Sequence, residues 1–313
     1  MSERTPIALT IAGSDSGAGA GIQADLKTLA ALGVYAACVV TAVTAQNTKG
    51  VRAVHFIPAE TVRAQIEAVM EDFAVAAIKV GMLGNAEIVE AVADLLPSPV
   101  GRGVGGEGAR AEQVDDFRPE PSSGAPRHLL LRGEGKAGPW EDSGPFVVYD
   151  PVMAASSGDA LSGVGFIEAV RSKLLPRVDC LTPNLAEAAA LLGESSAGTT
   201  AEMARQGKAL LMLGPRAALM KGGHLEGPKA VDLLVAANGV HRFASQKLAS
   251  KNLHGTGCTL SSAIAAFLVR GEALPEAVRL AKAFVSKAIA RGSLLRLGSG
   301  AGPLIQSNLF ARR

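Results

Sequence analysis

A glycine-rich turn followed by a helical pattern is the stretch of this sequence best suited to chemistry. The turn reads His254-Gly255-Thr256-Gly257-Cys258, and apolar residues at helical spacing follow it from Leu260 to Leu268. The first N–H groups of a helix have no partner within the helix, and the helix dipole adds partial positive charge there. The pattern therefore predicts a phosphate-binding anion site at residues 255–258. A plain glycine turn with a half-buried cysteine is the alternative interpretation of these residues alone.

Cys258 lies at the mouth of this predicted anion site. Because a helix N-terminus stabilises a thiolate, we expect the pKa of Cys258 to be lowered. A thiol in that state could accept the proton of a substrate hydroxyl near neutral pH. The alternative is that Cys258 only packs against and positions the reacting groups.

Asn184 and Glu187 stand one turn apart at the start of another predicted helix. Carboxylate and amide oxygens at this spacing suit a hydrated Mg²⁺ that also binds phosphate oxygens. The same spacing is typical of an N-cap asparagine followed by a glutamate in the first turn. Both interpretations stay open at the level of the sequence.

Gln46 follows the predicted strand at residues 35–43, and the carboxyl ends of parallel strands are where open α/β sheets bind ligands. Its amide carries a donor and an acceptor, which suits the edge of a heteroaromatic base. A surface turn is the alternative interpretation. A second glycine-rich loop, residues 13–21, follows the predicted strand at residues 7–12. It lacks the dinucleotide-binding spacing, because Ile22 stands where the third glycine would be.

Strands and helices alternate along the chain and so position these residues. This alternation, together with 36 glycines and an aromatic content of only 4%, favours repeated βα units over an all-β fold. Further strands are predicted at residues 76–80, 146–149, 179–182 and 217–220, and a strand pair at 231–236 and 240–243. Helices are predicted from Ile22 to Gly33, at 58–70, 86–96, 166–175, after Asn184, at 200–213, from 259 and at 275–290.

The segment 99–145 interrupts this alternation. Of its 47 residues, 16 are glycine or proline and 14 are charged, which is a composition that cannot bury enough apolar surface to fold. Because the βα pattern resumes afterwards, we interpret it as an insertion into one domain of residues 1–313. We expect most of residues 101–142 to be mobile and to lie outside the sheet. The alternative is that Leu129–Leu131 and Trp140 form a lid over the site.

Charge and composition exclude several classes of protein. The 31 basic and 29 acidic residues give a net charge of +2 without a basic run, so neither nucleic acid nor an acidic membrane surface is expected as a partner. There is no apolar run of 18 residues and no signal-peptide pattern, so we expect a cytoplasmic protein. Cys38, Cys180 and Cys258 fit neither a disulfide framework nor a Cys-x-x-Cys metal site.

Seven motifs occur in one order along the chain, and together they carry a resemblance to a known family. They read AGSDSGAGAGIQADLKT, TAVTAQNT, KVGML, YDPVM, TPNLAEA, MKGGH and HGTGCT. In combination they resemble the hydroxymethylpyrimidine/phosphomethylpyrimidine kinases of thiamine biosynthesis, which belong to the ribokinase-like superfamily. The resemblance covers nearly all of residues 7–302 outside the insertion. It implies a three-layer α/β/α sandwich with a mostly parallel central sheet.

The resemblance also implies a reaction and its site. ATP would phosphorylate 4-amino-5-hydroxymethyl-2-methylpyrimidine and then its monophosphate in a single site, with Mg²⁺ as cofactor. By motif, the pyrimidine would contact Gln46, Asp25, Gly13, Val43 and Met82. The nucleotide would contact Lys221, Asp150 and Asn184, and Mg²⁺ would be held by Asn184 and Glu187. The catalytic anion site would be Gly255, Thr256, Gly257 and Cys258, where many superfamily members carry an aspartate base in place of the cysteine. We expect a homodimer.

Three other functions compete with this one. A pyridoxal kinase of the same superfamily would bind a similar hydroxymethyl ring. A non-catalytic pyrimidine sensor would need only the base pocket, so the presence of the anion site together with Cys258 and Glu187 disfavours it. An NAD-dependent dehydrogenase is disfavoured by the glycine spacing of the N-terminal loop.

Overall fold

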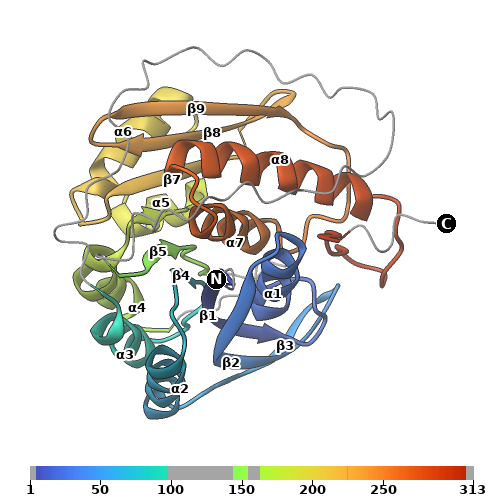
Figure 1. Ribbon diagram of the computed structural model, residues 1–313. Helices are drawn as coiled ribbons and strands as arrows, with labels where there is room; N and C mark the ends of the chain where they lie inside the picture. The colour runs from blue at the N-terminus through green and yellow to red at the C-terminus, as the bar shows by residue number, and fades with distance from the viewer. Residues whose placement is uncertain (1–4, 98–143, 154–162, 224, 308–313) are drawn as a thin grey trace.

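One mixed sheet organises the protein (Figure 1). The computed structural model describes residues 5–97, 144–153, 163–223 and 225–307, and every strand in these ranges belongs to that sheet. The strands are β1 (Ile7–Asp15), β2 (Tyr35–Asn47), β3 (Gly50–Phe56), β4 (Ala77–Val80), β5 (Phe146–Tyr149), β6 (Cys180–Leu181), β7 (Ala217–Gly222), β8 (Lys229–Ala236) and β9 (Gly239–Gln246).

The order of strands across the sheet is β3-β2-β1-β4-β5-β6-β7-β8-β9. The central strands from β2 to β7 pair in parallel, whereas β3 at one edge and β8 and β9 at the other pair antiparallel. The prediction of a mostly parallel sheet is therefore confirmed. The β8–β9 hairpin, predicted from Asn238-Gly239, is also confirmed.

Helices cover both faces of the sheet and give three layers (Figure 1). They are α1 (Gly21–Ala31), α2 (Ala59–Asp72), α3 (Ala86–Leu95), α4 (Phe166–Ala169), α5 (Leu185–Leu192), α6 (Thr200–Leu211), α7 (Thr256–Val269) and α8 (Leu274–Gly292). The apolar residues of α1, α7 and α8 pack on one face, and those of α2 to α6 pack on the other. The sandwich implied by the motifs is confirmed.

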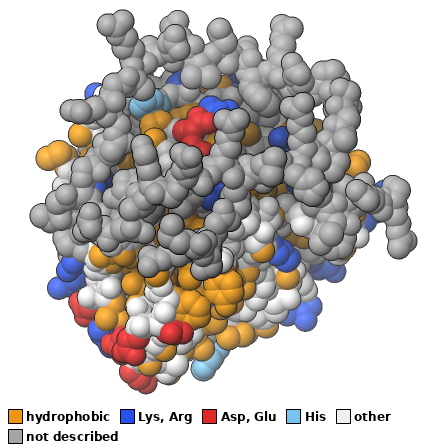
Figure 2. Space-filling model, viewed as in Figure 1, with side chains coloured by type: hydrophobic (Ala, Val, Ile, Leu, Met, Phe, Trp, Pro, Cys, Tyr) orange, Lys and Arg blue, Asp and Glu red, His pale blue; other side chains and the backbone are white. Residues whose placement is uncertain are grey.

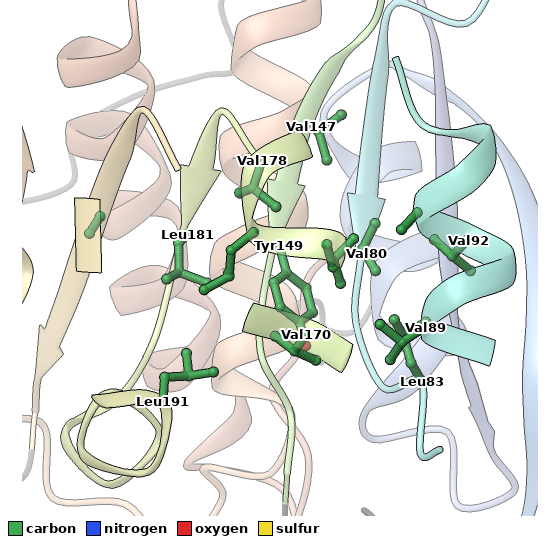
Figure 3. Close-up of a cluster of buried hydrophobic side chains, with 14 of the residues drawn as sticks. Val80, Leu83, Val89, Val92, Val147, Tyr149, Val170, Val178, Leu181 and Leu191 are labelled. Atoms are coloured by element: carbon green, nitrogen blue, oxygen red, sulfur yellow. The ribbon is translucent and has the colours of Figure 1, made fainter. Parts of the chain in front are cut away.

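Aliphatic side chains fill the core between these layers. Tyr149 of β5 is fully buried and lies beside Val170, with Val80 and Leu181 on the adjacent strands (Figure 3). Such strands are apolar on both sides because helices cover both faces of a parallel sheet. This explains why their residues form continuous apolar runs in the sequence.

Strand β2 and its partner β3 differ from the prediction. Strand β2 was expected to end at Val43 but continues to Asn47, and β3 was not predicted. Between Ala45 and Gln46 the pairing register shifts, so one extra residue of β3 bulges out of the ladder. The bulge breaks the two-residue alternation that identifies strands in a sequence. As a consequence, Gln46 is held in a β-ribbon rather than in a loop.

The surface carries charges of both signs on the described part of the face in Figure 2. None of the helices in the described ranges is long and apolar enough to cross a membrane. The segment 99–145 lies outside the described residues except for its last two positions. The predictions of mobility for residues 101–142 and of a lid at Leu129–Leu131 and Trp140 therefore stay predictions.

Candidate active site

A cavity of about 930 Å³ opens at the carboxyl ends of β1, β2, β5 and β7. The N-termini of α5 and α7 also face it, as the rule for ligand sites in open α/β sheets predicts. Of the residues predicted from the sequence, those that line it are Gly13, Gln46, Met82, Asp150, Asn184, Glu187, Lys221, Gly255, Thr256, Gly257 and Cys258. Two others, Asp25 and Val43, do not line it.

The turn before α7 requires glycine at Gly255 and leaves little room for a side chain at Gly257. Gly255 is the N-cap of α7 with φ of 84°, and a Cβ there would collide with the carbonyl oxygen of Gly19. A Cβ on Gly257 would lie 3.0 Å from Asp150 Oδ2. No side chain caps this helix. The Thr256 N–H donates to the backbone carbonyl oxygen of Leu253 at 3.2 Å, and the N–H groups that follow it have no side-chain acceptor. This arrangement has the features of an anion site.

Cys258 lies in the first turn of α7 but is only 9% exposed. Burial raises the pKa of its thiol to about 11, and the negative charges of Asp25 and Asp150 act in the same direction. The positive charge of Lys79 and a hydrogen bond with the backbone of Gly21 oppose this without outweighing it. The predicted lowering of the pKa was therefore wrong, because it considered the helix terminus and not the burial.

Lys221 and two carboxylates form a charged cluster at the cavity wall. Lys221 Nζ lies 2.7 Å from Asp150 Oδ1 and 3.7 Å from Glu187 Oε2. Burial raises the pKa of Glu187 to about 7, with Asp150 adding to this effect and Lys221 opposing it. Burial disfavours the charged form of Lys221, yet Asp150 and Glu187 raise its pKa above the ordinary value. The lysine therefore remains a cation beside the anion site.

Asn184 and Glu187 cap helix α5 reciprocally. Asn184 Oδ1 accepts a hydrogen bond from the backbone N–H of Glu187 at 2.9 Å, and Glu187 Oε2 accepts one from the backbone N–H of Asn184 at 2.7 Å. The N-cap interpretation is confirmed. Within the described ranges, no group of three or more His, Cys, Asp or Glu side chains forms a metal site. The assignment of Mg²⁺ to these two residues stays a prediction.

Asp25 lies beneath the cavity rather than in its wall. Its carboxylate is fully buried and accepts hydrogen bonds from Thr10 Oγ1 at 2.6 Å, Lys79 Nζ at 2.8 Å and Ser262 Oγ at 2.7 Å. Its contact with the pyrimidine stays a prediction. Val43 is 49% exposed and is not one of the residues that line the cavity. Lys79 was missed, although a lysine within an apolar strand signals a buried ion pair.

Asp15 and His254 were also missed as site residues. Asp15 lies at the end of β1, and His254 directly precedes Gly255; both line the cavity. His254 Nε2 lies 2.9 Å from Asp15 Oδ2 and 3.3 Å from Gln46 Nε2. His254 therefore connects the N-terminal glycine-rich loop, through Asp15, with Gln46 and with the anion site that begins at Gly255. Both residues lie in glycine-rich motifs, so the sequence could have identified them as candidate site residues. It gives no sign that they contact each other.

Known proteins resemble this chain along most of its length. The family model described as phosphomethylpyrimidine kinase matches residues 15–102 and 140–305. A hydroxymethylpyrimidine/phosphomethylpyrimidine kinase of Rhizobium meliloti is 45% identical over 300 residues, which cover 96% of each chain. The crystal structure of phosphomethylpyrimidine kinase from Clostridium difficile is 36% identical, with a TM-score of 0.67 over 90% of this chain and 99% of the other. An ADP complex of Bacillus subtilis pyridoxal kinase is 29% identical, with a TM-score of 0.75 over 99% of this chain and 100% of the other.

Proposed function

This chain belongs to the phosphomethylpyrimidine kinase family, and from that premise we propose that it makes the pyrimidine diphosphate needed for thiamine biosynthesis. ATP would phosphorylate 4-amino-5-hydroxymethyl-2-methylpyrimidine and then the resulting monophosphate. One observation carries the proposal: a single cavity contains an amide suited to a base edge, Gln46, and the uncapped N-terminus of α7 at Gly255. A ring held at the first can present its hydroxymethyl group to a phosphate held at the second.

The cavity supplies what phosphoryl transfer needs. The reaction depends on positioning and on neutralising charge on the transferring phosphate, rather than on covalent participation by the protein. The first N–H groups of α7 and the cation of Lys221 are placed to do this, because Gly257 brings the helix start close to Lys221 and Asp150. The nucleotide would be ATP, in keeping with the ADP bound by the pyridoxal kinase of similar fold.

The charged cluster fits a hydrated Mg²⁺. Mg²⁺ is usually bound by one or two carboxylates together with water and phosphate oxygens, and Asp150 and Glu187 provide two such carboxylates around Lys221. Asn184 would contribute by holding Glu187 in the capping box. When bound, the ion would neutralise charge on the phosphate oxygens.

Cys258 would act as a thiol and not as a thiolate. With a pKa of about 11, the group is almost fully protonated at neutral pH, so it can orient the substrate hydroxyl but is a poor proton acceptor. The alternative role considered from the sequence, in which Cys258 packs and positions, is the one that this burial supports.

Sequence identity favours the pyrimidine over pyridoxal as the substrate. The chain is 45% identical to a pyrimidine kinase and 29% identical to a pyridoxal kinase over nearly the full length of each. The near balance of 31 basic and 29 acidic residues supports a small-molecule substrate without a nucleic-acid partner. The cytoplasmic location and the homodimer expected from the family complete the proposal, and light scattering of the purified protein would measure the latter.

The proposed function is tested by ADP release with each acceptor supplied separately. We expect Mg²⁺-dependent release with the aminopyrimidine and with its monophosphate, above the background seen with ATP alone. Lys221→Met should abolish release with both acceptors, because it removes the cation beside the anion site. Turnover of pyridoxal with none on either pyrimidine would overturn the proposal.

A further inference from the structure

His254 has two polar neighbours at one ring nitrogen. Its Nε2 atom lies 2.9 Å from Asp15 Oδ2 and 3.3 Å from the amide nitrogen of Gln46. A carboxylate requires a proton on this nitrogen, whereas an amide N–H requires a lone pair. The ring nitrogen cannot satisfy both neighbours, so one of the two contacts determines its state.

Asp15 determines that state because it is held as a carboxylate. Its two oxygens also accept hydrogen bonds from the backbone N–H groups of Gly17 at 2.8 Å, Gly19 at 3.0 Å and Ala20 at 2.9 Å. Burial alone would raise the pKa of Asp15, but the hydrogen bonds from His254, Ala20 and Gly17 outweigh it and lower the pKa. His254 Nε2 therefore carries a hydrogen and donates a hydrogen bond to the Asp15 carboxylate.

Thr44 contacts the other end of the Gln46 amide and also determines which amide atom is oxygen and which is nitrogen. Thr44 Oγ1 lies 3.0 Å from the carbonyl oxygen of Ser14, which can only accept a hydrogen bond. It also lies 3.1 Å from the Gln46 amide atom placed as Oε1. The single hydroxyl hydrogen goes to the carbonyl, so the hydroxyl oxygen is left to accept from Gln46. Amide oxygen and nitrogen are similar in size, and their hydrogen-bonding partners decide which is which. A half-turn of the amide places its nitrogen where it can donate to Thr44 Oγ1. The turn also places the amide oxygen, rather than a second N–H donor, beside the His254 N–H that is bonded to Asp15.

We propose that His254, held by Asp15, is a positioning residue that fixes the Gln46 amide with its oxygen toward His254 and its nitrogen toward Thr44. This inference rests on the proposed function for the identity of the ring. The fixed amide then offers one acceptor on the His254 side and one N–H donor on the Thr44 side of the cavity that it lines. That pair matches a ring with an amino group next to a ring nitrogen, and it rejects the 4-oxo ring, in which donor and acceptor are exchanged.

The orientation also directs the reacting group. In the aminopyrimidine, the amino group lies between the ring nitrogen and the hydroxymethyl group. With the amino group toward His254, the hydroxymethyl group extends past His254, which is followed directly by the anion site at Gly255. The reverse orientation of the amide would place the hydroxymethyl group on the Thr44 side instead. In this proposal, His254 therefore influences both the recognition of the ring and the position of its hydroxymethyl group.

The test compares binding and turnover of the aminopyrimidine and its 4-oxo counterpart. Calorimetry gives the ratio of the two Kd values in the wild type, His254→Ala, His254→Gln and the control His55→Ala, an exposed histidine on β3 that lies outside the cavity lining. We expect the wild type and His55→Ala to prefer the amino ring by roughly a hundredfold or more, as sites that pair polar groups do. In His254→Ala the ratio should fall at least about tenfold, because the amide is then able to turn. His254→Gln should restore most of the ratio, because it retains an N–H donor facing Asp15.

Kinetics and a double variant separate this role from a structural one. In His254→Ala the KM for the aminopyrimidine should rise while the KM for ATP stays unchanged. In a Gln46→Ala background, adding His254→Ala should leave the Kd ratio unaltered, because His254 acts through Gln46. A Kd ratio that survives in His254→Ala, or an equal further loss in the double variant, would overturn the inference. Selective binding without turnover would instead contradict the proposed function alone.

Discussion

The pKa values of single residues in this site depend on local effects and on burial in the tertiary structure, which act in opposite directions. Cys258 is the clearest case. The start of α7 favours a thiolate, but the side chain is almost fully buried. Burial is the larger influence and raises the pKa to about 11. Glu187 shows the same balance in a carboxyl, since burial and Asp150 raise its pKa to about 7 despite the neighbouring Lys221. Both groups favour the neutral form more than their residue type suggests.

The role of Cys258 can be measured from the size and pH dependence of its effect. Cys258→Ala should lower kcat by about tenfold, which is the cost of one hydrogen bond rather than of a general base. Cys258→Ser, the matched control, should retain most of the activity. Because the thiol stays protonated well below pH 11, wild-type kcat should be level between about pH 7.5 and 9. A rise of tenfold per pH unit across this range would identify the thiolate as the base.

At the scale of elements, a buried polar network joins the parts that build the site. Asp25 of α1 is bonded to Thr10 of β1, Lys79 of β4 and Ser262 of α7. The Asp25–Lys79 ion pair is fully buried, with 2.8 Å between its charged atoms. Through Ser262 the network anchors α7 one turn beyond Cys258. The helix whose N-terminus forms the anion site is therefore held against β1, β4 and α1.

Removing one partner of this ion pair should be costly. Lys79→Met would leave the Asp25 carboxylate buried without its cation, and we expect the free energy of unfolding to fall by about 3–5 kcal/mol. The double variant Asp25→Asn with Lys79→Met should recover part of that loss, since no charge remains buried. Urea unfolding measures both. Lys173→Met, an exposed control, should change stability by less than about 0.5 kcal/mol. An equally small effect of Lys79→Met would contradict the proposed anchoring role.

At the scale of the whole molecule, the segment 99–145 enters and leaves the fold at neighbouring points. A Cβ on Gly144 would lie 3.5 Å from Pro97 Cβ, so the two ends of the chain around the insertion are in contact. The family model leaves out residues 103–139, which lie within this segment. A kinase of this family can therefore close the sheet between α3 and β5 with a much shorter connection.

Replacing residues 101–142 by a short Gly-Ser link tests the segment. Because loop-closure entropy grows only logarithmically with length, the free energy of unfolding should change by about 1–2 kcal/mol at most. The kcat/KM values for both pyrimidines should be unchanged. Melting temperature and steady-state kinetics provide the measurements. A tenfold or greater loss of kcat/KM at an unchanged melting temperature would make the segment part of the active site.

The sequence by itself determined the features that depend on neighbours in the chain. Apart from β3, the order of strands and helices follows from residues within one turn or one hairpin of each other, and so does the β8–β9 turn. The capping of α5 was one of the two interpretations that the spacing of Asn184 and Glu187 allowed. The glycines of the anion site are also local, because Gly255 must adopt a positive φ at the start of α7. Periodicity and capping are properties of short stretches, so a sequence displays them directly.

Only the tertiary structure decided which polar groups meet and how deeply they are buried. His254 contacts Asp15 across 239 positions of the chain, and Ser262 contacts Asp25 across 237. No spacing rule reaches that far, so the Asp15–His254 contact was missed and Asp25 was expected in the cavity wall. The pKa of Cys258 was misjudged for the same reason. Its value depends on the water excluded by α1 and the central strands, and burial is a property of the packed elements rather than of any one of them.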